Sequence, residues 1–439
     1  MHAGASGAEL PAEVAAALQA CGVDEPDFHA AVIPLSDAGR LSLEVRAAEP
    51  VLPASVFKIV TTAAALDRFG PAWTWRTRFY AMERPEAGGM ASALWIKASG
   101  APWLPASDFR EGVARLRQLG LKRIEGPLVI DRSVFSEPPV DPAQFDGEPF
   151  RPYNQGPDAL ALGVQSVTCI FSPDPASGEA RVTHAPELPG YAMPARAPLQ
   201  EGDCPSNLAR ALLPQEQDSG LVFRGGYPAS CGERAWSVTP WPGAWFGDRY
   251  AGEVFRGFWE AEGGIWTGRA ETGAVPESAR ELLSIASRPL ADLVKAINKN
   301  SINPMARNLF LLLSAGEGTP GTLEGSRRAL SAWLASKGVD AAGFAPDNGS
   351  GLSRRERASV RQIAGVLRAA YESWWAPELL ASLPIAGQDG TMRRRGLAAG
   401  SARVKTGYMR GVRSIAGYVK ASSGGWYAVC AIINSPAAA

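Results

Sequence analysis

A serine and a lysine three positions apart are the residues of this 439-residue chain that most directly suggest chemistry. Ser55 and Lys58 stand in the run PASVFK at 53–58, where the proline and the small residue suit the first turn of a helix. On a helix the lysine amine would lie beside the hydroxyl, and the free N–H groups of the first turn would stabilise an oxyanion. The pair therefore fits a serine nucleophile with a lysine base, if burial or a second cation lowers the lysine pKa. Taken alone, it also fits a capping serine next to a solvated lysine.

Two further short motifs follow along the chain. Ser-x-Asn occupies 301–303 after a predicted helix, and Lys-Thr-Gly occupies 405–407 on a predicted strand. Lys405 would supply the second cation that lowers the pKa of Lys58, and it could also hold a substrate carboxylate. Gly407 would let a substrate backbone lie flat against the strand edge.

Histidine is nearly absent, with only His2, His29 and His184, and no Gly-x-Ser-x-Gly motif occurs. A Ser-His-Asp hydrolase would have to use His184, so we expect that the base of an acyl-transfer reaction is not histidine. A histidine metal site would have too few ligands, and we expect neither a metal nor a cofactor. The five cysteines form no Cys-x-x-Cys pair. Cys204 and Cys231 flank a turn-rich segment and could be bridged in an oxidising compartment.

The composition excludes several classes of protein. Lys plus Arg and Asp plus Glu both number 44, so the formal net charge is zero and gives no reason to bind nucleic acid or an anionic membrane. The chain is 46% hydrophobic and 20% charged, which is typical of a globular protein rather than a disordered one. No apolar run approaches the roughly 18 to 20 residues of a transmembrane helix. The first residues lack the basic and apolar regions of a signal peptide.

The two ends of the chain predict one antiparallel sheet. We expect helices over 13–20, 54–69 and 290–299, and strands over 28–35, 41–47, 402–409, 414–420 and 426–434. Two strands from the beginning and three from the end could pair and be flanked by these helices. The middle of the chain would then be an insertion into a discontinuous domain.

The middle of the chain has a different pattern of predicted elements. A strand–helix–strand pattern covers 93–98, 107–119 and 128–131, and short alternating strands such as 179–184 follow in sequence rich in Pro and Gly. Five tryptophans lie within 31 residues: Trp236, Trp241, Trp245, Trp259 and Trp266. They favour the aromatic core of a small domain, with a sugar- or peptide-binding platform as the alternative.

The ordered set of motifs resembles that of penicillin-binding proteins and serine β-lactamases. Further stretches are similar to the class C low-molecular-mass penicillin-binding proteins, the D-alanyl-D-alanine carboxypeptidases and endopeptidases of the penicillin-binding protein 4 type. These stretches are TTAAAL at 61–66, DNGSGLS at 347–353, LPIAG at 383–387 running into DGT at 389–391, and the ending from GV at 411–412 to IN at 433–434. The interval of 246 positions from Ser55 to Ser301 is also similar to that of this family, because β-lactamases have a much shorter interval between the two motifs.

This resemblance implies an α/β (α+β) fold. A transpeptidase-like, β-lactamase-like domain with a five-stranded antiparallel sheet would comprise 1–75 and 280–439. The inserted region, 76–279, would hold two smaller, nested β-rich domains.

The resemblance also assigns the acyl-transfer chemistry. Ser55 would attack the carbonyl of the penultimate D-alanine and form an acyl-enzyme, while Lys58 would take its proton. Ser301 would relay a proton to the leaving amine, and Asn303 would position the lysine and the substrate amide. The backbone N–H groups of Ser55 and Tyr408 would form the oxyanion hole, in which losing one donor costs about 3 kcal/mol in comparable sites.

The remaining residues implied by the resemblance would bind substrate. Lys405 would face the substrate carboxylate or tune the serine pair, Thr406 would bind that carboxylate, and Gly407 would accommodate the substrate backbone. The segment 146–154 is similar to the family region that holds an acidic contact for the free amine of diaminopimelate. Asp146 is the predicted contact, and a solvated loop carboxylate is the alternative.

Three positions depart from the family pattern. Ile302 stands where Asp or Asn is usual, Arg307 follows Ala306 where Glu is common, and Tyr408 replaces a Thr or Ser. The Tyr408 ring could narrow the pocket and change turnover or antibiotic affinity.

The implied function is that of a serine D-alanyl-D-alanine carboxypeptidase or endopeptidase. Its partners would be peptidoglycan peptides and β-lactam antibiotics, and no feature indicates an oligomeric state. The alternatives are a β-lactamase or esterase of the same fold, which would deacylate fast, and a cell-wall-binding protein with weakened catalysis. A peptidoglycan substrate implies a mature, periplasmic or otherwise extracytoplasmic protein, and in that oxidising setting we predict a Cys204–Cys231 disulfide.

Overall fold

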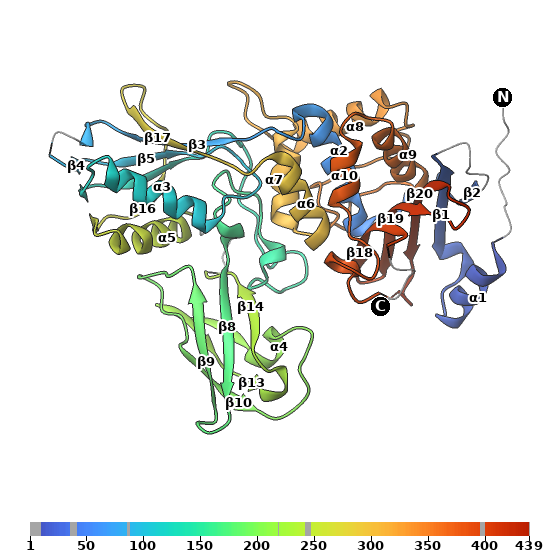
Figure 1. Cartoon of the computed structure of the whole chain (residues 1–439), viewed down its shortest axis with the longest axis horizontal. Coiled ribbons are helices and arrows are strands. Elements are labelled where there is room, and N and C mark those ends of the chain that lie inside the picture. Colours follow the sequence, from blue (N-terminus) through green and yellow to red (C-terminus); the bar gives the residue numbers. More distant parts are fainter. Residues whose placement is uncertain are drawn as a thin grey trace. The chain divides into compact units, whose positions relative to one another are not determined.

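The computed structural model describes residues 10–35, 42–85, 88–217, 219–241, 247–395 and 400–438. The chain forms two compact units (Figure 1). The first joins two segments far apart in the sequence, Met1–Thr74 and Arg288–Ala439, and the second is Trp75–Ser287.

The first unit contains a five-stranded antiparallel sheet, as predicted. Its order is β18-β19-β20-β1-β2, with β18 at Ala402–Met409, β19 at Val412–Lys420, β20 at Trp426–Asn434, β1 at Phe28–Pro34 and β2 at Leu43–Val45. The central strand β20 pairs with β19 on one side and with β1 on the other, so the sheet joins both ends of the chain. The strand β2 is shorter than predicted because Arg46 adopts a left-handed conformation with φ +43°, which ends the extended run.

Helices pack around this sheet. They are α1 (Ala12–Ala20), α2 (Lys58–Phe69), α6 (Leu290–Asn300), α7 (Asn303–Leu312), α8 (Leu323–Ser336), α9 (Val360–Tyr371) and α10 (Ala376–Ser382), with 3₁₀ turns η1 (Glu25–Asp27), η2 (Ala54–Phe57) and η7 (Gly390–Met392). Helix α9 packs against β20, β1 and β19, and α2 lies among α6, α7 and α9. Every residue of α2 from 58 to 66 is buried. From 59 to 66 the side chains are apolar or small on all sides of the helix, as expected for a fully buried helix.

The helix predicted over 54–69 divides in two. Ser55 lies in the 3₁₀ turn η2, and the α-helix begins at Lys58. Ala54 has φ +48°, a left-handed conformation that costs a non-glycine residue of order 1–3 kcal/mol. Such strain immediately before a candidate nucleophile is typical of a functional site.

The second unit contains several sheets. Its strands are β3 (Arg76–Ala81), β4 (Met90–Ala91), β5 (Leu94–Lys97), β6 (Arg123–Ile124), β7 (Leu128–Asp131), β8 (Val167–Asp174), β9 (Glu179–Ala185), β10 (Arg196–Gln200), β11 (Pro214–Gln217), β12 (Gly220–Phe223), β13 (Tyr227–Pro228), β14 (Arg234–Val238), β15 (Ile265–Trp266), β16 (Ala270–Thr272) and β17 (Arg280–Ala286). They form sheets ordered β16-β7-β5-β3-β17, β13-β10-β9-β8-β14, β15-β6-β4 and β11-β12.

Helices and turns complete the second unit. They are α3 (Ala106–Gln118), α4 (Ala209–Leu212) and α5 (Gly247–Ala261), with 3₁₀ turns η4 (Pro152–Asn154), η5 (Gly163–Gln165) and η6 (Ala229–Cys231). The predicted strand–helix–strand pattern is confirmed, since β5 and β7 pair in parallel and α3 lies between them in the chain.

Tryptophans build the core of the second unit. Trp236, Trp241, Trp259 and Trp266 are all buried within one hydrophobic cluster, whereas Trp245 lies outside the described residues. For these four side chains the structure favours the core interpretation over an exposed binding platform.

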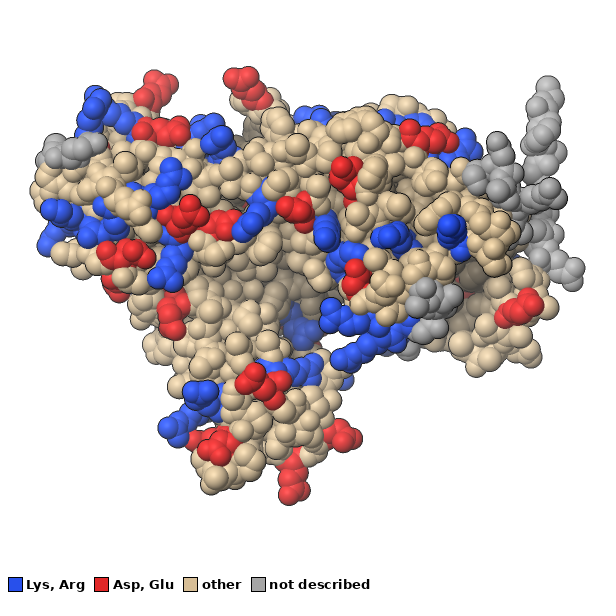
Figure 2. All heavy atoms as spheres, viewed as in Figure 1, with Lys and Arg blue, Asp and Glu red and all other residues tan. Residues whose placement is uncertain are grey.

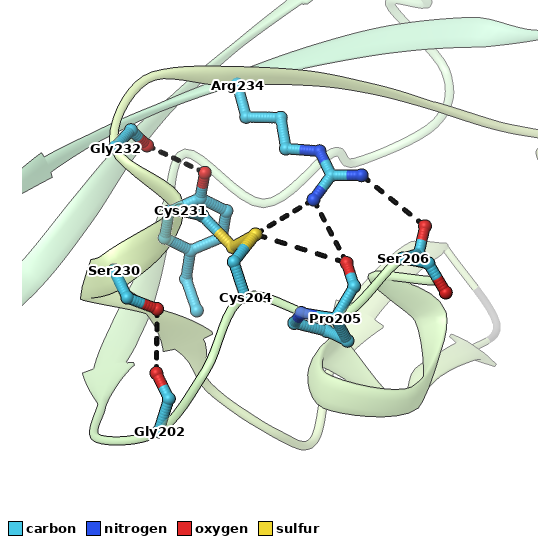
Figure 3. Close-up of a disulfide and its surroundings, with 9 residues drawn as sticks. Gly202, Cys204, Pro205, Ser206, Ser230, Cys231, Gly232 and Arg234 are labelled. Carbon is cyan, nitrogen blue, oxygen red and sulfur yellow. Dashed lines mark hydrogen bonds between the residues drawn. A yellow bond between two sulfur atoms is a disulfide. The ribbon is translucent and has the colours of Figure 1, made fainter. Parts of the chain in front are cut away.

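The predicted disulfide between Cys204 and Cys231 is confirmed, with a Cα–Cα distance of 4.8 Å (Figure 3). The Arg234 guanidinium donates to Cys204 Sγ over 2.8 Å and to the Pro205 carbonyl over 3.0 Å. The bridge and the arginine therefore hold the 204–206 segment to the start of β14.

The length of the helices and the charges on the surface are two further features of the described chain. Within the described ranges, no helix has both the length and the apolarity to span a bilayer. Acidic and basic side chains both occur over the visible surface of each unit (Figure 2), as expected for a chain of zero net charge.

Replacing both bridged cysteines with serine should lower the free energy of unfolding by roughly 2–4 kcal/mol, because the disulfide restricts a 27-residue loop in the unfolded chain. Denaturant unfolding of the double variant measures this loss. The control is Cys21→Ser, which removes an exposed free thiol and should leave stability unchanged. Peptide mass mapping that found free thiols at both 204 and 231 in the oxidised protein would contradict the bridge.

Candidate active site

The peptide that leads to Ser55 is attached to the sheet. Ser414 Oγ, on β19, donates to the Pro53 carbonyl over 2.7 Å. The side-chain amide of Asn434, at the end of β20, accepts from Leu52 N over 2.8 Å and donates to Leu52 O over 3.0 Å. Strands from the far end of the chain therefore fix the position of the serine turn.

Lys58 lies at the centre of the site and is fully buried. Its Nζ donates to Ser55 Oγ over 3.0 Å, to Asn303 Oδ1 over 2.6 Å and to the Ser350 carbonyl over 2.5 Å. An ammonium has three N–H donors and uses all of them here. After losing one proton, the amine keeps two donors for the amide and the carbonyl and turns its lone pair to the Ser55 hydroxyl. This geometry suits a base that takes the serine proton.

The surroundings of Lys58 favour its neutral form. Burial in the first place, and then the positive charges of Lys405 and Arg307, hold the Lys58 pKa well below its usual range, against an opposing contribution from Glu356. Both sources proposed from the sequence, burial and a second cation, are therefore present.

Ser301 and Lys405 form a second pair. Ser301 ends α6 with φ +59°, in the turn before Asn303 begins α7. Lys405 Nζ donates to Ser301 Oγ over 2.9 Å and to the Thr406 carbonyl over 2.7 Å. Burial lowers the Lys405 pKa to about 7. Each candidate serine thus has its own buried lysine.

The loop segment 383–391, noted as a resemblance, follows α10 in the chain and makes hydrogen bonds to both α6 and β18. Lys299 Nζ, on α6, donates to the Leu383 carbonyl over 2.7 Å and to Asp389 Oδ2 over 2.6 Å. At the other end of the loop, the hydroxyls of Thr391 and Thr406 share a hydrogen bond of 2.8 Å. The loop therefore supports the Lys-Thr-Gly segment from outside the sheet.

Gly407 marks a close approach between β18 and the serine turn. A Cβ at this position would lie 2.8 Å from Ser55 N and 2.2 Å from Ser414 Oγ, so a side chain has no room. β18 is also an edge strand of its sheet, where an extended peptide can add as a further strand. The Ser55 N–H thus lies beside the strand on which the sequence places the other oxyanion donor.

Two predicted site residues, Tyr408 and Asp146, are not among the hydrogen-bonded groups described above for the two serine–lysine pairs. The Tyr408 side chain is 63% exposed, and the Arg413 guanidinium stacks on its ring 3.9 Å from the centroid, so the effect of the ring on the pocket stays a prediction. Asp146 belongs to the second unit, where it accepts from Tyr153 Oη and Asn154 Nδ2, each over 2.7 Å. Its role toward diaminopimelate also stays a prediction.

The sequence analysis assigned no role to the groups that complete the Lys58 site. The Ser350 carbonyl belongs to the DNGSGLS stretch, which entered only as a resemblance, and the buried carboxylate of Glu356 follows it closely. A backbone acceptor has no residue type to signal it. The motif itself, rich in Gly, Ser and Asn, was the available signal for a tight and functional turn.

Comparison with known proteins decides the family. Residues 11–439 match the model of the D-Ala-D-Ala carboxypeptidase 3 (S13) family. The chain belongs to this family. It is a serine-type D-alanyl-D-alanine carboxypeptidase with the penicillin-binding protein 4 type of fold.

Individual relatives agree with this membership. A D-alanyl-D-alanine carboxypeptidase of Actinomadura sp. (strain R39) is 29% identical over 394 residues, covering 86% of this chain and 72% of the relative. The crystal structure of penicillin-binding protein 4 from Haemophilus influenzae superposes with a TM-score of 0.75 at 22% identity, covering 97% of this chain and 94% of that one. A structure of the same protein complexed with a β-lactam has a TM-score of 0.71 at 21% identity, with 96% and 92% covered.

Lys58→Arg should lower acylation by fluorescent penicillin by a factor of roughly 10⁴ or more, because a guanidinium keeps its proton at any usable pH. Ser55→Ala should abolish labelling and sets the lower limit of detection. The exposed Lys295 provides the matched control, since Lys295→Arg should label like the wild type. Labelling of Lys58→Arg at the wild-type rate would exclude a lysine base.

Lys405→Gln should move the acid limb of the pH–acylation profile to higher pH. The positive charge of Lys405 disfavours protonation of Lys58, so without it Lys58 accepts a proton at higher pH. The rate constant of acylation, measured against pH for the wild type, Lys405→Gln and the control Lys295→Gln, tests this sign. A limb that stays in place, or moves to lower pH, would show that Lys405 does not lower the Lys58 pKa.

Proposed function

We propose that Ser55 and Lys58 carry the D-alanyl-D-alanine carboxypeptidase activity of this chain, as nucleophile and general base. The observation that supports this most directly is the fully buried Lys58 amine 3.0 Å from Ser55 Oγ, with its pKa held well below the usual range. A lysine in that state can take the serine proton near neutral pH.

The first step is attack on the peptide. Lys58 accepts the Ser55 proton as Oγ forms a bond to the carbonyl carbon of the penultimate D-alanine. The N–H groups of Ser55 and Tyr408 stabilise the negative charge that develops on the carbonyl oxygen. Thr406 and Lys405 hold the carboxylate of the terminal D-alanine, and Asn303 keeps the Lys58 amine oriented toward Oγ.

The second step is departure of the amine. As the peptide C–N bond breaks, the proton that Lys58 took from Ser55 passes through the Ser301 hydroxyl to the leaving nitrogen, and Lys58 becomes neutral again. The Ser301 hydroxyl is oriented by its hydrogen bond to Lys405. Water then attacks the acyl-enzyme and releases the shortened peptide. The same steps cut a cross-link when the leaving amine is a diaminopimelate side chain. We propose this endopeptidase activity as a second reaction of the same serine.

β-Lactams would acylate the same serine. The lactam carbonyl takes the place of the scissile peptide, and ring opening leaves a covalent ester on Ser55. The β-lactam complex of the similar Haemophilus influenzae protein supports this proposal.

The site of action would lie outside the cytoplasmic membrane. Peptidoglycan is found there, and the Cys204–Cys231 disulfide is of the kind that persists in oxidising compartments. Both observations support a periplasmic or otherwise extracytoplasmic location.

Incubation with fluorescent penicillin should give one long-lived label per chain, on the peptide that contains Ser55, and a synthetic peptide ending in D-Ala-D-Ala should release D-alanine. Mass spectrometry locates the label and an amino-acid assay measures the release. Rapid multiple turnover of penicillin without D-alanine release would instead indicate a β-lactamase. Absence of both label and release would indicate a wall-binding protein without catalysis.

A further inference from the structure

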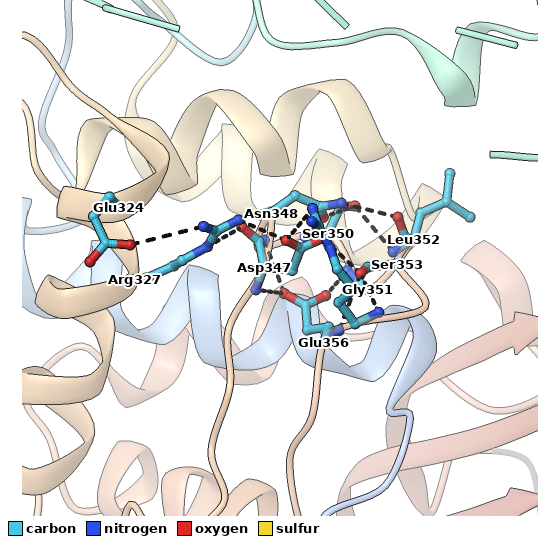
Figure 4. Close-up of polar contacts among 11 residues, drawn as sticks. Glu324, Arg327, Asp347, Asn348, Ser350, Gly351, Leu352, Ser353 and Glu356 are labelled. Atoms are coloured by element: carbon cyan, nitrogen blue, oxygen red, sulfur yellow. Dashed lines mark hydrogen bonds and ion pairs between the residues drawn. The ribbon is translucent and has the colours of Figure 1, made fainter. Parts of the chain in front are cut away.

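A carboxylate with no exposure to solvent lies beneath the loop at 347–353. Glu356 Oε1 accepts from the N–H groups of Asp347 and Gly349, each over 3.1 Å, and Oε2 accepts from Gly351 N over 2.8 Å (Figure 4). Three backbone N–H groups, at every second position of one loop, thus donate to one side chain. A buried carboxylate with such donors fixes the backbone it binds.

The same loop contacts the helix that begins at Lys58. The Ser350 carbonyl accepts from Lys58 Nζ over 2.5 Å, and the Gly349 carbonyl accepts from Thr61 Oγ1 over 2.7 Å. Gly351 has φ +77°, and a Cβ there would lie 1.9 Å from the carbonyl oxygen of Ala54, the residue before Ser55. The loop backbone therefore lies directly against the serine turn, and a shift of the loop would displace the lysine acceptor.

One peptide group connects the carboxylate to the lysine. The Ser350 C=O and the Gly351 N–H belong to the same planar trans peptide, so they point in opposite directions. Binding of the N–H by Glu356 Oε2 therefore aims the carbonyl at Lys58 Nζ. Polarisation along this chain strengthens both hydrogen bonds.

Other polar groups of the loop are bonded locally or toward the surface. Asn348 Oδ1 accepts from both the N–H and the hydroxyl of Ser350, over 3.0 and 2.7 Å. Asp347 accepts from Ser353 Oγ and from the guanidinium groups of Arg327 and Arg355. These contacts shape the loop, whereas Glu356 holds the peptide that faces the lysine.

Glu356 also supplies a negative charge beside two buried cations. Burial, Lys405 and Arg307 lower the pKa of Lys58, and the Glu356 charge opposes that shift. Burial lowers the pKa of the Arg307 guanidinium to about 10, and Glu356 opposes that shift as well. Burial raises the pKa of Glu356 itself to about 7, with a further contribution from Asp347, while the backbone donors act in the opposite direction.

We propose that Glu356 is a positioning residue for the catalytic base, acting through the Ser350–Gly351 peptide to hold the Lys58 amine toward Ser55. The inference rests on the proposed role of Lys58 as the base. It adds a residue that no motif of the active site includes.

Glu356→Gln tests the proposal. At present the two carboxylate oxygens accept three N–H groups. A glutamine amide has only one oxygen, so its NH₂ group would face at least one of these donors. The substitution also removes the negative charge. We expect acylation by fluorescent penicillin at the optimum to slow by roughly 10- to 100-fold, as expected for a misplaced catalytic group. The acid limb should move to lower pH, because Lys58 is harder to protonate without the neighbouring carboxylate.

Two variants separate positioning from other effects. Glu372→Gln removes the same charge from an exposed carboxylate that pairs with Arg368 on α9, and it should label like the wild type at every pH. Glu356→Asp keeps the charge but is one methylene shorter. It should slow acylation while leaving the acid limb close to its wild-type position.

Thermal unfolding establishes that each variant is folded before acylation is measured. A folded Glu356→Gln that acylates at the wild-type rate would overturn the proposal, and so would a slower one whose acid limb has not moved. If Glu356→Gln does not fold, Glu356→Asp decides, and wild-type acylation by that variant overturns the proposal. A wild-type chain that fails to label would instead refute the proposed function, so the two failures are distinguishable.

Discussion

The burial of one lysine amine constrains the whole site. Lys58 has no contact with solvent, and a charge in such a place is costly unless it is paired and fully hydrogen-bonded. The chain supplies three acceptors for the amine but surrounds it with two further cations, Lys405 and Arg307. The acceptors hold the group in place, while burial and the cations favour its neutral form. Lys58 can act as a base because its amine is both held toward Ser55 by the acceptors and kept easy to deprotonate by burial and the cations.

The acceptors of Lys58 come from segments that are distant in the sequence. Asn303 begins α7, Ser350 lies in the loop bound by Glu356, and the peptide that precedes Ser55 is held by Ser414 of β19 and Asn434 of β20. A site assembled in this way forms only when the sheet that joins the two ends of the chain has formed. The strained conformations at Ala54 and Ser301 persist because the surrounding contacts determine them.

Much of this arrangement could be predicted from local sequence. The strands at 402–409 and 426–434 have clear β-propensity and turn signals, and the structure has the same boundaries. The three motifs indicated the residue types that meet at the site. The division of 54–69 into a turn and a helix could not be predicted, because a left-handed alanine has no signature of its own. The Ser350 carbonyl was missed because its role depends on a contact made across some 290 positions of the chain. Glu356 was missed because its partners, although local, are backbone N–H groups that no residue type signals.

The central claim is that burial and neighbouring cations hold the Lys58 pKa well below its usual range, and this pKa can be measured directly. Lysines labelled with ¹³C at Cε report their own titration by NMR, and the Lys58 signal is assigned by its loss in Lys58→Arg. The account predicts a Lys58 resonance that titrates well below the usual lysine range. A resonance that titrates at the ordinary value of about 10.4 would contradict it.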